Sequence, residues 1–252
     1  MILSHLGFGY SDAPNMTMAE FAGFSKIAGG LNTHNLIRQG WEGKFFDAEL
    51  ENLDIGLYKR VLTRQTIADS FREANIPIDV DYVSIDVDSV DVWLLMGLLE
   101  GGYRPRVISV EYNGLWTKDQ LITCREEWEP WAMGYSVVFG ASAAAIDYIG
   151  RKYGYKTVDM MWGDMFMVKE DILQEKCPNY FDLPTFDYLA EGVTGWVSWD
   201  NCDREEAMRR FVDLPLEMEG KHEEAKAKAA EALRDRNEYR RKYNYLQTLC
   251  SS

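Results

Sequence analysis

The sequence predicts an α/β protein built on a doubly wound, mostly parallel sheet. Short β-branched segments alternate with helical segments along residues 20–168, and this alternation is typical of such sheets. Two of the segments, 81–91 and 106–113, are apolar runs that end abruptly in acidic or amide residues. Buried parallel strands have this pattern. We therefore expect both carboxyl ends at one rim of the sheet, where open α/β sheets bind their ligands.

The remaining elements follow from apolar spacing and from the residues that stop helices. Helices are expected to end near Gly40, Pro77 and Gly101, because glycine and proline do not continue a helix. The first strand is expected to end within 20–24, and a helix precedes Gly40. The expected strands are 20–24, 44–49, 57–62, 81–88, 106–113, 156–160 and 165–168. The expected helices are 32–39, 66–74, 92–100 and 141–153.

The chain is expected to have three parts, namely an irregular lead-in over 1–19, one α/β domain over 20–190 and an extension over 191–252. The extension contains a predicted long helix, 221–249, which is rich in Ala, Glu, Lys and Arg. Its apolar residues form a stripe suited to a partner helix, to a protein partner or to the chain's own domain. A solvated charged helix is the other interpretation. The residues of the stripe are Ala232, Tyr239, Tyr243 and Leu246.

Composition excludes several classes of partner. With 46% apolar residues the chain can bury a large core, and its 27 basic against 41 acidic residues give a net charge of −14. Nucleic-acid and anionic-membrane surfaces need clustered Lys and Arg, so neither is expected. No apolar run reaches the ~18 residues of a membrane span, and no secretory signal is visible. The four cysteines are widely spaced, which favours a reducing intracellular compartment, cytoplasmic by default.

Acidic residues at the predicted rim suggest two kinds of chemistry. Asp86 and Asp88 share one face of a strand, so with Asp91, Glu111 or Asn113 they could complete the oxygen shell of a divalent cation. Asp86 or Glu111 could instead remove a proton from an acceptor. The structural alternative is that Asp91 caps the following helix while Asp86 and Asp88 bind backbone amides.

Two further groups are candidates for the site. His34 follows the predicted glycine loop, and its ordinary pKa near neutrality suits a general base, although a histidine on a helix surface is more common. Trp116, Trp128 and Trp131 lie in a long irregular stretch and could wall an apolar acceptor pocket. Packing of that stretch against the sheet edge explains them equally well.

The order and spacing of six segments resemble the FkbM-type branch of class I S-adenosylmethionine-dependent methyltransferases. The resemblance covers roughly residues 20–168 and leaves the C-terminal quarter of the chain unmatched. The segments that carry it are Glu20-Phe21-Ala22-Gly23, Asn32 to Ile37, Gly40 to Glu49, Tyr82 to Asp88, Val107 to Asn113, and Phe139 to Ser142.

The resemblance implies a Rossmann-like sheet of seven strands, with S-adenosylmethionine over the carboxyl ends of the first strands. Gly23, in the loop after the first strand, would lie close to the amino-acid end of the cofactor. Asp47, or Glu49 as a near alternative, would accept hydrogen bonds from the ribose. Glu20 and Asp86 would complete the cofactor site, and the fourth-strand acids would face the methyl donor or the acceptor.

Three functions are therefore considered. The first is methyl transfer to an oxygen of a small molecule or glycan, in which the protein positions donor and acceptor and Asp86, Glu111 or His34 takes up the proton. The second is a methyltransferase-like structural subunit without cofactor. It is suggested by Ser25 and Lys26, which stand where related sequences usually carry an Asp and a second Gly. A third, metal-dependent transfer would use Asp86 and Asp88.

Overall fold

The computed structural model describes residues 16–21, 32–127, 140–161, 163–177, 183–195 and 211–214 of the 252-residue chain. The chain divides into two compact units, 1–212 and 213–252. The sheet and the helices described below, up to Val212, belong to the first unit. The predicted lead-in up to residue 15 and the predicted helix 221–249 lie outside the described residues. No described helix has the length and apolar character that crossing a membrane requires.

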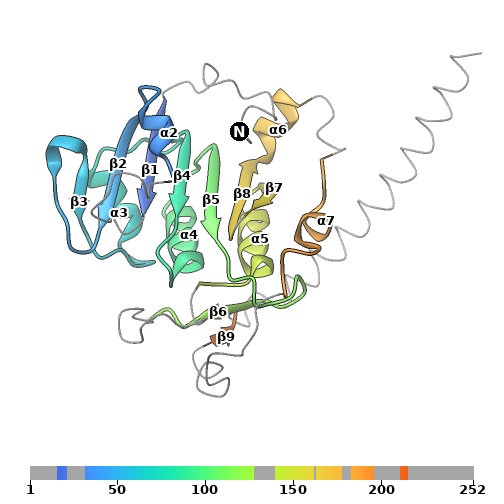
Figure 1. The fold of residues 1–252 in the computed structure, drawn as a ribbon. Helices are drawn as coiled ribbons and strands as arrows, with labels where there is room; N and C mark the ends of the chain where they lie inside the picture. Colours follow the sequence, from blue (N-terminus) through green and yellow to red (C-terminus); the bar gives the residue numbers. More distant parts are fainter. Residues whose placement is uncertain are drawn as a thin grey trace, which may run out of the picture. The chain divides into compact units, whose positions relative to one another are not determined.

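A seven-stranded sheet forms the centre of the first unit (Figure 1). Its spatial order is β3-β2-β1-β4-β5-β8-β7, with every pairing from β3 to β5 parallel and with β8 antiparallel to both of its neighbours. The expected mostly parallel α/β sheet is thus confirmed. The strands are β1 (Thr17–Phe21), β2 (Glu42–Asp47), β3 (Leu57–Lys59), β4 (Tyr82–Ile85), β5 (Val107–Glu111), β7 (Tyr155–Met161) and β8 (Asp164–Lys169).

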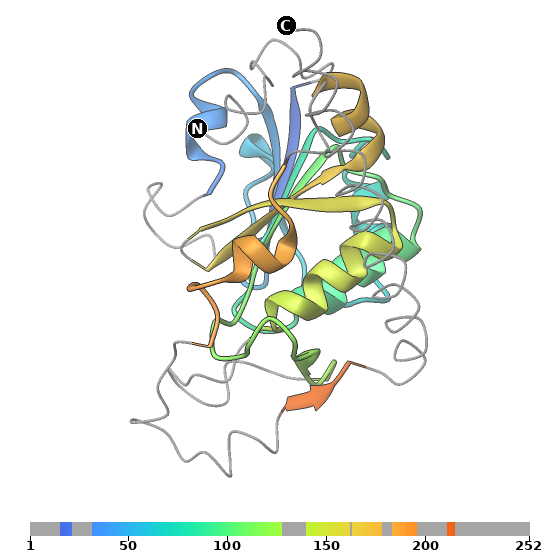
Figure 2. The same ribbon diagram turned by 90° about the vertical axis from the view of Figure 1, so that its right-hand side faces the viewer.

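Three helices cover one face of the sheet (Figure 2). They are α3 (Ile67–Glu73), α4 (Asp91–Glu100) and α5 (Ala143–Lys152). Nine of the ten residues of α4 are buried, because this helix packs on the sheet with a helix on each side. Aromatic rings fill the space under α3. The rings of Phe21, Phe46 and Phe71 stack with centroids 5.3–5.7 Å apart, and Tyr103 packs edge-on against Phe71 at 5.0 Å.

The remaining elements are short. On the opposite face, α2 (His34–Ile37) and α6 (Glu170–Lys176) contribute Leu36, Ile172 and Leu173 to an apolar cluster with Met18 and Tyr82. The sequence analysis did not predict α6, because no strong periodicity marks residues 170–176. Also unpredicted are the 3-10 helix η2 (Leu53–Ile55), α7 (Phe186–Ala190), and the paired strands β6 (Ile122–Cys124) and β9 (Phe211–Asp213).

Most predicted elements occur close to their expected positions. The first strand differs most, since β1 begins at Thr17 and so extends into the segment that we predicted to be irregular. The predicted third strand, 57–62, ends at Lys59. An edge strand pairs on one side only, so few backbone hydrogen bonds are available to extend it.

One face of the central strands changes from apolar to polar toward the carboxyl ends. Strand register places Glu20 beside Ser84 and Ser84 beside Ser109, across β1, β4 and β5. All three residues are buried. Central strands of parallel sheets are normally apolar on both faces, so a row of buried polar residues across three of them indicates a site on this face.

Candidate functional site at the carboxyl ends of the strands

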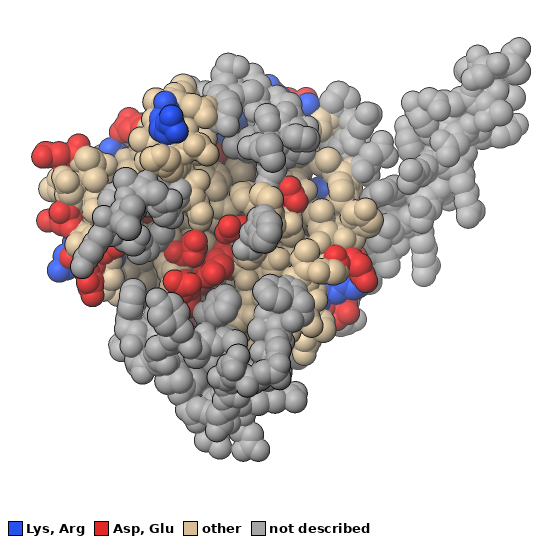
Figure 3. All heavy atoms as spheres, viewed as in Figure 1, with Lys and Arg blue, Asp and Glu red and all other residues tan. Residues whose placement is uncertain are grey.

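The strand order defines where a ligand is expected. From β3 to β5 it follows the order 3-2-1-4-5 of doubly wound dinucleotide-binding sheets, whose ligands lie where the order reverses, beyond the carboxyl ends. The reversal here falls between β1 and β4. Acidic side chains gather over this part of the molecule in the space-filling view (Figure 3). The sequence and the topology therefore identify the same rim.

Three predicted residues meet at this rim. Asp86, Asp88 and Glu111 each place one carboxylate oxygen within 4.8 Å of the others. Asp86 directly follows β4 and Glu111 ends β5, and these strands are parallel neighbours. Asp88 is exposed and has a φ of 56°, in the left-handed region that costs most residues energy but that Asp tolerates. Backbone in this region is often found at functional sites.

Asp91 has a structural place in the turn between β4 and α4. It is fully buried at the first position of α4, and its two carboxylate oxygens accept hydrogen bonds from the backbone N–H groups of Val87 and Ser89, at 2.8 and 3.0 Å. The helix-capping alternative is therefore wrong for Asp91, because the N-cap of α4 is Val90 and the N–H groups that Asp91 accepts precede the helix. With both oxygens engaged by the backbone, Asp91 supports the turn that carries Asp86 and Asp88.

Burial and mutual repulsion raise the pKa of every rim acid for which a shift is resolved. Burial raises the pKa of Glu111 to about 10, with repulsion from Asp91, Asp86 and Asp88 adding to the shift. Burial likewise raises the pKa of Asp91 to about 7. The pKa of Asp86 is raised by burial and by Asp88, while a hydrogen bond from Asn32 opposes the rise. Among the described residues, no Lys or Arg side chain contributes to these shifts.

Asp164 joins the rim although the sequence analysis did not select it. Strand register pairs it with Glu111, and burial together with Asp86 and Glu20 raises its pKa to about 6. Asp164 is the first residue of β8, so it reaches the carboxyl-end rim only because β8 runs antiparallel. The hairpin-like character of the last two predicted strands was the available signal, since the second strand of such a pair begins where the first ends.

Glu20 is buried beneath the rim. Its carboxylate accepts hydrogen bonds from the backbone N–H groups of Asn32 and Thr33 and from the Thr33 hydroxyl. These contacts tie β1 to the start of the next described segment, at Asn32. Burial is the main reason that the pKa of Glu20 is raised. Its predicted contact with a cofactor stays a prediction.

The other predicted site residues are placed as follows. Asp47 ends β2, and its Oδ1 atom accepts hydrogen bonds from the backbone N–H groups of Glu49 and Leu50, at 2.7 and 2.8 Å. Glu49 is exposed. His34 begins α2, and among the described contacts none joins its side chain to the acidic rim. The side-chain oxygen of Asn113 accepts a hydrogen bond from the Leu115 N–H.

Part of the predicted site lies outside the described residues. This part comprises Gly23, with its neighbours Ser25 and Lys26, and the indoles of Trp128 and Trp131. Trp116 is described, and its buried ring packs edge-on against Phe211 with centroids 4.8 Å apart. For Trp116, packing is therefore the observed role.

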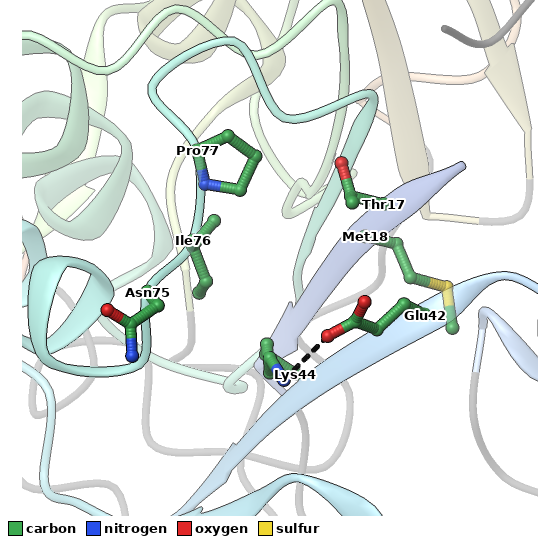
Figure 4. Close-up of a pocket in the computed structure, with 7 residues that line it drawn as sticks. All are labelled: Thr17, Met18, Glu42, Lys44, Asn75, Ile76 and Pro77. Carbon is green, nitrogen blue, oxygen red and sulfur yellow. Dashed lines mark ion pairs between the residues drawn. The ribbon is translucent and has the colours of Figure 1, made fainter. Parts of the chain in front are cut away.

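A shallow cavity among the described residues lies at the opposite edge of the sheet (Figure 4). Its volume is about 80 Å³, against about 300–1,000 Å³ for ordinary ligand pockets. It is lined by the amino-terminal residues of β1 and β2, which include Thr17 and Glu42, and by the segment after α3. A Glu42–Lys44 ion pair lies beside it. Size and position both separate this cavity from the rim.

The geometry of the rim is compatible with two kinds of chemistry. Oxygens on opposite sides of a Ca²⁺ ion are about 4.6–5.2 Å apart and those around Mg²⁺ are closer, so the three carboxylates have a suitable spacing for either ion. The same carboxylates could take up a proton or face a positively charged ligand.

Comparison of the chain with protein-family models, with curated proteins and with solved structures found no match.

Proposed function

We propose that this protein is an S-adenosylmethionine-dependent methyltransferase that acts on an oxygen of a small molecule or glycan. The observation that carries the proposal is that the acidic rim, at the carboxyl ends of β4 and β5, lies next to the β1–β4 reversal point of the sheet. The seven strands have the number that the sequence resemblance implies. The class I methyltransferase assignment of the sheet is part of this proposal.

The proposed role of each residue follows from its position in the sheet. Asp47, at the end of β2, would bind the ribose, and Asp86, at the end of β4, would face the reacting groups. S-adenosylmethionine would supply an electrophilic methyl group bonded to a sulfonium. The acceptor oxygen would form the new bond to carbon as the carbon–sulfur bond breaks, and its proton would pass to a rim carboxylate. Asp86 suits this role better than Glu111, whose raised pKa keeps it protonated at neutral pH.

Titration of the full chain with S-adenosylmethionine in a calorimeter tests the proposal. We expect saturable binding, and we expect Asp47→Ala to weaken it at least tenfold because the ribose hydroxyls lose a charged acceptor. Asp54→Ala, an exposed acid in η2 near β2, is the matched control and should leave affinity unchanged. Neither heat nor a thermal shift at millimolar S-adenosylmethionine would refute the enzyme and favour the structural-subunit alternative.

A divalent cation at Asp86, Asp88 and Glu111 is a second candidate, because the oxygen spacing there suits such an ion. A cation would displace the proton that Glu111 holds at neutral pH. Titration of the chelator-treated protein with Mn²⁺ should therefore release protons, seen as heat that varies with the ionisation enthalpy of the buffer. Glu111→Gln should remove this variation, whereas an absence of Mn²⁺ binding at millimolar concentration would exclude the site.

A further inference from the structure

Asn32 links two strands at the reversal point of the sheet. Its side-chain Nδ2 lies 3.1 Å from the Oδ2 atom of Asp86 and 3.3 Å from the hydroxyl of Ser84, while its backbone N–H donates to Glu20 at 2.8 Å. Glu20 belongs to β1, whereas Ser84 lies in β4 and Asp86 follows it. One residue thus contacts β1 and β4 where a ligand is expected.

The orientation of the Asn32 amide follows from its partners. An ionised carboxylate only accepts hydrogen bonds, so the NH₂ group of the amide must face Asp86. Ser84 is itself fixed, because the Ser109 hydroxyl donates to it at 3.2 Å and the buried Tyr82 hydroxyl lies 2.6 Å from that of Ser109. The polar row across the sheet therefore ends at Asn32 and holds its amide in place.

We propose that Asn32 is a positioning residue that orients the carboxylate of Asp86 for a cationic methyl donor, an inference that rests on the proposed function. Asn32 engages the Oδ2 atom, and no described residue donates to Oδ1. Holding one oxygen restricts the rotation of the carboxylate and leaves the other oxygen available to a ligand. A group oriented before the ligand binds loses less entropy on binding.

The ratio of the affinities for S-adenosylmethionine and S-adenosylhomocysteine distinguishes a positioning role of Asn32 from a purely structural one. S-adenosylmethionine carries a positive sulfonium, whereas S-adenosylhomocysteine has a neutral thioether in its place. An oriented Asp86 carboxylate favours the charged ligand, so its misalignment should weaken S-adenosylmethionine more than S-adenosylhomocysteine. General damage to the strands around the site would weaken the binding of both ligands by the same factor. The ratio therefore reports on the orientation of Asp86.

The experiment measures both dissociation constants by calorimetry for the full chain and three variants. Asn32→Ala should lower the preference for S-adenosylmethionine about tenfold, since a hydrogen bond to a charged group is worth about one to two powers of ten. Ser84→Ala removes one contact that orients the amide and should lower the preference about threefold. Asn52→Ala is the matched control, because that side chain only caps η2, and it should keep the unmodified ratio.

Each outcome decides the proposal. Equal weakening of both ligands by Asn32→Ala, or an unchanged ratio in a folded Ser84→Ala protein, would overturn the positioning role while the proposed function stands. If Asn32→Ala does not fold, the Ser84→Ala ratio alone decides. If the unmodified chain binds neither ligand, the proposed function fails and the inference fails with it.

Discussion

Replacing Asp91 by alanine is expected to lower the free energy of unfolding by about 3 kcal/mol at pH 6. The two carboxyl oxygens of Asp91 accept hydrogen bonds from the N–H groups of Val87 and Ser89 inside the β4–α4 turn. Each N–H group left without a partner costs about 1–3 kcal/mol when buried. The removed carboxyl group also leaves unfilled space beside a fully buried helix start. Urea unfolding followed by circular dichroism measures the loss.

The loss should be smaller at pH 9 than at pH 6. Burial raises the pKa of Asp91 to about 7 in the folded protein, so its favourable contribution is complete below the unfolded pKa near 4 and declines as pH rises through 7. Above pH 7 the variant therefore gains from losing a buried charge beside Asp86. Asp79→Asn is the control, since Asp79 is an exposed acid shortly before β4, and it should change stability by less than about 0.5 kcal/mol. A loss independent of pH would contradict the raised pKa.

Replacing Glu111 by glutamine is expected to raise the free energy of unfolding by about 5 kcal/mol at pH 8 in the presence of a chelator, since each pH unit between about 4.3 and 8 costs the unmodified protein about 1.4 kcal/mol. Burial and the neighbouring acids raise the pKa of Glu111 to about 10, whereas an unfolded chain ionises it near 4.3. The folded state thus holds a proton that the unfolded state releases, so stability falls as pH rises from about 4.3 through 10. Glutamine has nearly the same shape and removes this dependence.

Unfolding by urea at pH 5 and pH 8 measures this difference. At pH 5 the variant and the unmodified protein should differ by only about 1 kcal/mol, because pH 5 lies about 0.7 unit above the unfolded pKa and little of the pH-dependent loss has accumulated there. Glu73→Gln is the matched control, since Glu73 forms an exposed ion pair with Arg60 at 3.2 Å. Exposed pairs of this kind contribute about 0–1 kcal/mol. Equal stabilities of the Glu111 variant and the unmodified protein at pH 8 would contradict the proposed burial of this acid.

Local sequence patterns predicted the central strands well. Val83 to Ile85 and Val107 to Val110 are buried, and a continuous apolar run has few other places in an α/β protein than a central parallel strand. The acids that follow these runs were predicted to share a rim, and Asp86 and Glu111 do. Parallel neighbours end at the same edge, so strand direction alone was sufficient for this step.

The positions of Asp164 and Asn32 in the site could not be predicted from local sequence patterns. Asp164 pairs with Glu111 because β8 inserts antiparallel between β5 and β7, and the insertion point depends on which strand edge is available. Asn32 contacts Asp86, 54 residues away in the chain. Its sequence surroundings predicted only a helix start. Asp91 was predicted as a metal ligand from its spacing in the sequence. In the structure it is buried, and its side chain accepts backbone hydrogen bonds within the β4–α4 turn.

The sequence by itself determined the alternation of strands and helices, the parallel direction of the central strands and the acidic character of their ends, because apolar periodicity and chain direction are local properties. Only the tertiary structure decided which acids are buried together, how far their pKa values rise, and which amide faces Asp86. Those properties depend on strand order and on distances between residues far apart in the chain. Burial and Coulomb repulsion act through space, and the sequence records neither directly.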